Sequence, residues 1–224
     1  ALFIVLWILG QDEEVIKNVA GYFKDPVGFS DKMKAISVLD GMMQLPTDSA
    51  QSVIEKIKER ESEVDRLNAM KDSIVSDLSS NSEFSNLIDQ IKIEIVNEGL
   101  RIEMVESNDN VFFEIGTSQL CPEAQKLLKE IGKNLTVIPN KLIIEGHTDS
   151  RPYSNDGSGY SNFDLSTDRA NSARRVILAS GLEFGRIDEV RGYADTRLLD
   201  KKDPFNLVNR RISIIIKFAT EIPK

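Results

Sequence analysis

LIIEGHTDSRPY at residues 142–153 and LSTDRANSARR at residues 165–175 decide the fold of the second half of this chain. The first segment predicts an apolar strand that runs into a polar loop. The second predicts a helix that Ser166 caps, with Arg169 in its first turn. The carboxylate of Asp149 and the guanidinium of Arg169 then lie near the mouth of one loop. Such a pair can hold the two charged ends of a small zwitterion, but it is poorly suited to breaking a covalent bond.

Charge and spacing alone leave two interpretations of Asp149 and Arg169 open. In one, Arg169 and the free amides of the first helical turn bind a carboxylate, while Asp149 binds an ammonium group. In the other, Asp149 and Arg169 form an internal ion pair that fixes the loop. Arg210 precedes the last predicted strand. It could reach the same loop mouth, or it could be a charge that keeps the strand edge from pairing with other chains.

The other elements of the second half are predicted from the alternation and periodicity of apolar residues. They are strands at 100–106, 111–115, 141–145, 188–193 and 211–218, and helices at 122–135 and 166–180. The Ile-rich last strand is expected to lie centrally in the sheet, because strands buried on both faces are continuously apolar. Residues 99–219 are therefore predicted to form an α+β domain, a βαβαββ sandwich with helices on one face of a mixed sheet.

The apolar residues 1–10 are too few to cross a bilayer, which takes about 20 residues. They are interpreted as the end of a transmembrane helix, with a buried helix of a soluble domain as the alternative. Residues 11–27 predict a short amphipathic helix that needs lipid or a partner protein to lie on. The alternative is that this segment extends the membrane helix.

Residues 28–47 predict a linker, and residues 48–98 predict a helical region. The long first helix has apolar residues near heptad spacing, which Arg60 and Lys71 interrupt. A break at residues 79–82 precedes a second helix predicted from Ser82 to Val96.

Composition excludes several classes of function. The net charge of the 224 residues is −8, which argues against binding nucleic acid. Cys121 is the single cysteine and His147 the single histidine, so no disulfide, metal site or cofactor is expected. The sequence also lacks the G-x-S-x-G motif of a nucleophile elbow. The chain is therefore predicted to be a binding protein rather than an enzyme.

Four motifs occur in a recognisable order: residues 144–149 (IEGHTD), 165–170 (LSTDRA), 191–195 (RGYAD) and 209–212 (NRRI). Together they resemble the OmpA-like peptidoglycan-binding domain. The resemblance implies that Asp149 binds the ammonium group, and Arg169 the carboxylate, of diaminopimelate in the wall peptide. It also implies that Thr148, Leu165 and Arg210 line the same groove.

The N-terminal half, with Leu6-Trp7 followed by an amphipathic helix and a linker, resembles the MotB-type B subunits of flagellar stators. That resemblance implies an inner-membrane protein with a single span and a periplasmic C-terminal domain. It implies a homodimer surrounded by a pentamer of MotA-type A subunits, which contact the flagellar rotor. It further implies an ion path along the membrane helix, ion transport that drives flagellar rotation, and a plug at residues 11–27 that blocks ion leak.

Two alternatives stay open from the sequence. The first is an OmpA-like peptidoglycan anchor of another envelope or secretion system. The second is a peptidoglycan hydrolase that uses His147 and Asp149.

Overall fold

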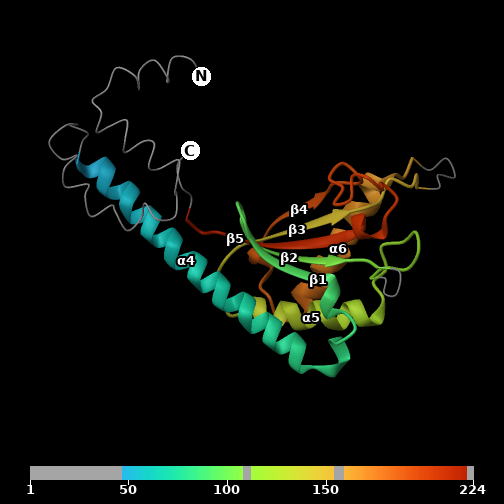
Figure 1. The fold of residues 1–224 in the computed structure, drawn as a ribbon, viewed down its shortest axis with the longest axis horizontal. Coiled ribbons are helices and arrows are strands. Elements are labelled where there is room, and N and C mark those ends of the chain that lie inside the picture. Colours follow the sequence, from blue (N-terminus) through green and yellow to red (C-terminus); the bar gives the residue numbers. More distant parts are fainter. Residues whose placement is uncertain (1–46, 108–111, 154–158, 221–224) are drawn as a thin grey trace, which may run out of the picture. The chain divides into compact units, whose positions relative to one another are not determined.

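The computed structural model describes residues 47–107, 112–153 and 159–220 (Figure 1). The chain divides into two units, Ala1–Val53 and Ile54–Lys224, and the packing below belongs to the second unit. The membrane helix predicted at 1–10, the amphipathic helix at 11–27 and nearly all of the linker at 28–47 lie outside the described residues. None of the helices in the described ranges is long and apolar enough to cross a membrane.

Five strands form one mixed sheet in the order β1-β2-β5-β3-β4 (Figure 1). Their bounds are β1 Ile91–Val96, β2 Gly99–Val105, β3 Leu142–His147, β4 Ile187–Gly192 and β5 Arg211–Lys217. Neighbours pair antiparallel, except that β3 and β4 are parallel. The order β2-α5-β3-α6-β4-β5 confirms the predicted βαβαββ fold, and β5 lies centrally and is almost wholly buried, as predicted.

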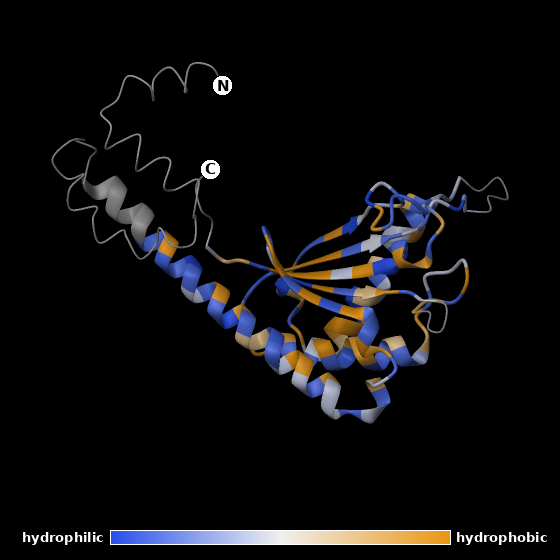
Figure 2. Ribbon diagram, in the orientation of Figure 1, coloured by the Kyte–Doolittle hydropathy of each residue, from blue (hydrophilic) through white to orange (hydrophobic). Residues whose placement is uncertain are grey.

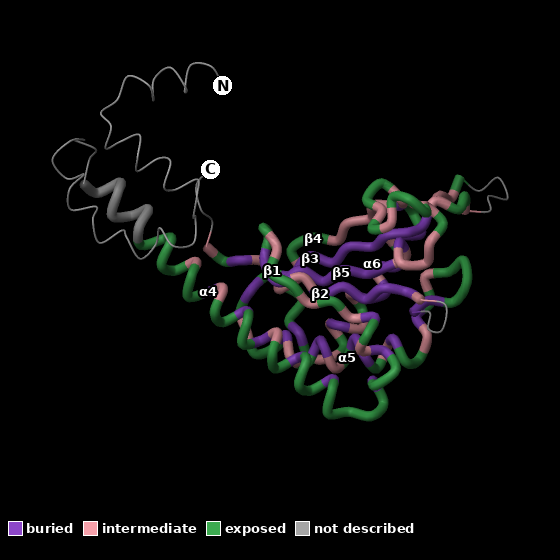
Figure 3. The backbone as a smooth tube through the Cα atoms, in the orientation of Figure 1, coloured by how far each residue is buried: buried purple, intermediate pink, exposed green. Residues whose placement is uncertain are grey.

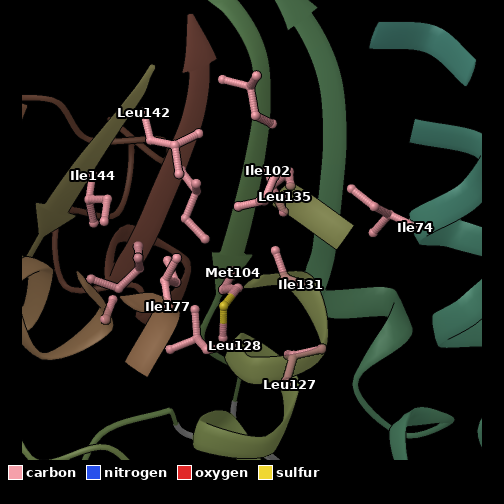
Figure 4. Close-up of a cluster of buried hydrophobic side chains, with 14 of the residues drawn as sticks. Ile74, Ile102, Met104, Leu127, Leu128, Ile131, Leu135, Leu142, Ile144 and Ile177 are labelled. Carbon is pink, nitrogen blue, oxygen red and sulfur yellow. The ribbon is translucent and has the colours of Figure 1, made fainter. Parts of the chain in front are cut away.

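Two helices, α5 (Pro122–Leu135) and α6 (Asn162–Ala179), pack on the same face of the sheet. Their apolar stripes meet alternate strand residues in the core, because strand side chains point alternately to the two faces. Figure 4 shows these side chains converging, among them Ile102, Met104, Leu128 and Ile144. The apolar stripe predicted for α5 is confirmed, since Ala124, Leu127, Leu128, Ile131 and Leu135 are all buried.

The long helix α4 (Thr47–Ser80) is mostly hydrophilic, with apolar residues at intervals (Figure 2). Leu67, Met70, Ile74 and Leu78 lie three or four residues apart and are buried in the same core as the sheet. Arg60, which was expected to interrupt the apolar seam, is itself a packing residue. Its guanidinium lies 3.0 Å from the centroid of the Phe218 ring and donates a hydrogen bond to the Thr220 carbonyl.

The second helix predicted from Ser82 to Val96 is wrong. Two short 3₁₀ helices, Ser82–Phe84 and Ile88–Gln90, lead instead into β1. The isoleucines of β1 alternate with polar residues, and this period of two favours a strand that pairs with β2. The turn between the two strands requires Gly99, because its φ is +154° and a Cβ there would lie 1.8 Å from the Ile216 carbonyl oxygen.

The strand predicted at 111–115 is also wrong for its described part. Residues 112–115 form only an isolated bridge, between Phe113 and Leu120. The apolar side chains of Phe112 and Phe113 are buried by packing against the core rather than by joining the sheet. Burial alone therefore produced the apolar run that suggested a strand.

Candidate functional site

A cavity of about 310 Å³ lies beyond the carboxyl end of β3. All five residues that the sequence singled out line it: Thr148, Asp149, Leu165, Arg169 and Arg210. Thr148 and Asp149 directly follow β3, and Arg210 directly precedes β5. These residues meet because β3 and β5 are antiparallel, with His147 opposite Arg211.

Helix α6 brings Leu165 and Arg169 to the cavity through a close contact with β3. A Cβ on Gly146 would lie 2.0 Å from the Ser166 carbonyl oxygen, so only glycine permits this approach. The Ser166 hydroxyl also accepts a hydrogen bond from the Ala194 amide at 3.0 Å, which ties the helix to the segment after β4. The cavity is thus built on rigid elements rather than on loops alone.

The predicted cap of this helix is wrong, and so is the anion site at its first turn. The helix begins at Asn162, and Ser161 and Asp164 form a capping box. Asp164 accepts hydrogen bonds from the Ser161 amide and hydroxyl at 2.8 and 2.6 Å. Arg169 therefore lies about two turns into the helix. The free amides of the first turn and the Arg169 guanidinium do not form one carboxylate-binding corner.

Asp149 is buried and is paired with two arginines. Its carboxylate accepts a hydrogen bond from Arg210 Nε at 2.8 Å and forms an ion pair with Arg151. The Arg151 amide also donates to Asp149 Oδ1 at 3.0 Å. The Arg151 side chain is 51% exposed, whereas that of Arg210 is only 22% exposed. The Arg151 contact is therefore the more easily replaced of the two.

Arg169 is 4% exposed and forms no ion pair with a described residue within 4 Å. The second interpretation, an internal ion pair between Asp149 and Arg169, is therefore wrong. Arg169 Nε donates to the Thr117 carbonyl at 2.9 Å, and the guanidinium lies 4.7 Å from the Phe113 ring centroid. Burial lowers the pKa of Arg169, and the Glu106 carboxylate counteracts this effect. The guanidinium keeps donors that a ligand in the cavity can use.

Glu106 lies near Arg169 and Arg210 and was not among the site residues predicted from the sequence. This residue is 2% exposed, and Oε1 accepts hydrogen bonds from the amides of Phe112 and Phe113 at 3.2 and 3.3 Å. Its Oε2 lies 3.9 Å from Arg210 Nη1. Burial raises the pKa of Glu106, while the positive charges of Arg169 and Arg210 act in the opposite direction. A carboxylate directly after an apolar strand was the available signal, because a charge in such a place is rarely buried unless it is paired.

His147 does not share the cavity with Asp149. It lines a different cavity, together with residues of β2, β5 and the segment after β4. The two residues of the proposed hydrolase pair are therefore directed to different places. In the described part of the chain, no group of three or more His, Cys, Asp or Glu side chains is arranged to hold a metal ion.

Comparison with known proteins identifies relatives of this chain. Residues 112–211 match the model of the OmpA family. The chain is 33% identical over 228 residues to Motility protein B of Escherichia coli K12, with 96% of this chain and 73% of that protein covered.

Two solved structures share the fold. The first, a MotB-like protein from Desulfovibrio vulgaris, has a TM-score of 0.59 at 18% identity, covering 71% of this chain and 98% of that one. The second, a periplasmic domain of Helicobacter pylori MotB, has a TM-score of 0.50 at 18% identity, covering 57% of this chain and 88% of that one.

The sheet, the two helices on one face and the matched residues define an OmpA-family domain. The similarity to Motility protein B extends well beyond that domain, over nearly the whole chain. The chain therefore belongs to the motility protein B family.

Proposed function

We propose that this chain is the B subunit of a flagellar stator and that the cavity beyond β3 binds the peptide of peptidoglycan. One observation carries the proposal: a carboxylate, Asp149, and three guanidinium groups, those of Arg151, Arg169 and Arg210, line a single cavity of about 310 Å³. A ligand with an ammonium group next to a carboxylate matches these charges. The amino-acid centre of diaminopimelate is such a ligand.

The contacts of each side chain suggest how the ligand is held. Arg169 has no carboxylate partner among the described residues, so its free donors are suited to the ligand carboxylate. Asp149 is suited to the ammonium group, which would replace the half-exposed Arg151. The buried Thr148 hydroxyl makes no hydrogen bond with a described residue and can pair with a polar group of the ligand. Leu165 supplies an apolar wall.

Membership of the motility protein B family supports the assembly that this function requires. In this proposal the chain spans the inner membrane once, and its C-terminal domain lies in the periplasm. Two copies form a dimer inside a pentamer of A subunits, which contact the rotor. The wall contact holds the stator still, so that ion flow along the membrane helices exerts torque. Residues 11–27 act as a plug until the stator joins a motor.

Co-sedimentation with purified sacculi tests the binding site. Arg169→Ala should abolish sedimentation of the protein, because it removes the donors for the ligand carboxylate. Arg175→Ala is the matched control, since Arg175 lies on the same helix, is exposed and donates a hydrogen bond to the Ser172 hydroxyl rather than to a residue of the cavity. Circular dichroism should show the same fold for both variants. Equal sedimentation of the Arg169→Ala variant and the control would refute the site.

The same experiment separates binding from hydrolysis. The wild-type protein should sediment with sacculi without releasing soluble muropeptides into the supernatant. Release that depends on Asp149 or His147 would instead support the hydrolase alternative.

A further inference from the structure

A second cavity, of about 360 Å³, lies on the opposite face of the sheet from α5 and α6. The strands contribute Arg101, Glu103, Glu145, His147 and Arg211, which alternate with the residues of the helix-facing core. The segment at 196–201 supplies the rest of the lining. Glu103, Glu145, His147 and Arg211 are all buried, and Figure 3 shows β3 and β5 buried along their length. The strand side of this cavity is therefore buried, whereas its rim at residues 196–201 includes exposed side chains.

The two carboxylates of this cavity already have partners. Glu103 Oε1 accepts hydrogen bonds from Arg211 Nε at 3.2 Å and from the Ser213 hydroxyl at 3.1 Å. Glu145 Oε1 accepts a hydrogen bond from Arg191 Nη1 at 2.9 Å. Their negative charges are thus compensated within the protein, and they leave little capacity to bind a cation.

Three positively charged side chains that line the cavity are not paired with a carboxylate of a described residue. Arg101, Arg197 and Lys201 line it, and none of their side chains forms an ion pair or hydrogen bond with a described residue. Glu94 lies opposite Arg101 in the β1–β2 register, but the two charges do not approach within 4 Å. The Nε of Arg101 is buried without a partner. The cavity therefore has an excess of positive charge.

His147 adds an unpaired neutral group to the same cavity. The residue is 2% exposed, and neither ring nitrogen makes a hydrogen bond with a described residue. The nearest carboxylate oxygen, Oε2 of Glu145, lies 3.8 Å from Nε2, which is too long for a hydrogen bond. The ring stacks on Tyr193 with centroids 5.2 Å apart, and Arg197 lies 3.7 Å from the centroid of that tyrosine. A buried polar group without a partner costs free energy, which a ligand can recover.

We propose that this second cavity binds a phosphate group, held by Arg101, Arg197 and Lys201 with His147 as a further hydrogen-bond donor. Guanidinium forks match the oxygens of phosphate, and three uncompensated cations suit an anion that carries up to two charges. The cavity is larger than one phosphate ion, so a phosphate ester also fits. The site is separate from the cavity proposed to bind the wall peptide.

Nuclear magnetic resonance offers a direct test because the chain has a single histidine. The imidazole signals of His147 are followed while inorganic phosphate, or glycerol phosphate as an ester, is added at constant ionic strength. Binding predicts a saturable shift that chloride does not produce. Tighter binding of glycerol phosphate would identify the ligand as an ester, and equal or weaker binding would identify the free ion.

Variants at the exposed positions Arg197 and Lys201 test the role of the charges. Binding is taken from the saturation of the shift in each variant, because Arg197 also contacts Tyr193, which stacks on His147. Arg197→Gln and Lys201→Gln should each weaken phosphate binding by up to about fivefold, and the double variant by roughly twentyfold. Arg175→Gln, on the exposed side of α6, is the matched control and should bind like the wild type. Sedimentation of the double variant with sacculi should be unchanged. A shift that does not saturate, or one that the double variant retains in full, would overturn the proposal.

Discussion

Replacing Glu63 by alanine should weaken the attachment of α4 to the segment that follows β5 and lower the stability of the domain. Glu63 is 1% exposed although it is charged. Its carboxylate accepts hydrogen bonds from Asn140 Nδ2 at 2.7 Å, the Ala219 amide at 2.7 Å and the Thr220 amide at 3.2 Å. These contacts join the helix to segments that lie far from it in the sequence.

The expected magnitude follows from what each donor can do after the change. A hydrogen bond to a charged group contributes about 1.5–3 kcal/mol. Asn140 keeps a second acceptor, the Lys217 carbonyl at 2.8 Å, and the amides of Ala219 and Thr220 lie near the surface, where water can replace the carboxylate. The loss is therefore well below three full bonds, and we expect the free energy of unfolding to fall by about 3 kcal/mol.

Urea unfolding followed by far-ultraviolet circular dichroism measures this loss. Glu61→Ala is the matched control, because Glu61 lies on the same helix and is exposed, and it should change the free energy of unfolding by less than about 0.5 kcal/mol. Glu63→Gln should lower the free energy of unfolding by an amount between those of the other two variants, since glutamine keeps an acceptor but loses the charge. A loss below about 1 kcal/mol for Glu63→Ala would refute the argument that this carboxylate holds α4 to the domain.

Three further predictions concern the two cavities. Arg151→Gln should tighten binding to sacculi by up to about fivefold, because it frees Asp149 from a half-exposed ion pair; weaker binding would show instead that Arg151 contacts the ligand. Glu106→Ala should lower the free energy of unfolding by about 3 kcal/mol, since two buried amides lose their acceptor and Arg169 loses a nearby negative charge. Urea unfolding measures this loss, and a change below about 1 kcal/mol would contradict it. Burial lowers the pKa of His147, so its imidazole signals should titrate below pH 6.5. Folding favours the neutral form of the ring. The contribution of His147 to the stability of the fold is therefore fully present above its ordinary pKa, and it is lost as the pH falls through the lowered pKa. Titration of these signals above pH 6.5 would contradict the prediction that burial lowers the pKa of His147.

Local patterns of apolar residues in the sequence predicted much of the fold. The apolar stripe of α5 repeats at helical spacing, and the Ile-rich run of β5 indicated a central strand, and both predictions are confirmed. The predictions that failed were those in which one pattern fitted two structures. β1 was taken for part of a helix because Ile88, Ile91 and Ile95 also recur at helical spacing, and pairing with β2 decides for the strand. The start of α6 was placed at Ser166 because both Ser161 and Ser166 are suitable caps.

The sequence by itself determined which residues meet at the cavity beyond β3, because the order of the four motifs singles them out even though the start of α6 was misplaced. Only the tertiary structure decided how their charges are paired. Asp149 binds Arg151 and Arg210 rather than Arg169, and the buried carboxylate of Glu106 faces both Arg169 and Arg210. The physical reason is range: periodicity and capping act over a few residues, whereas an ion pair depends on which elements the whole sheet brings within about 4 Å.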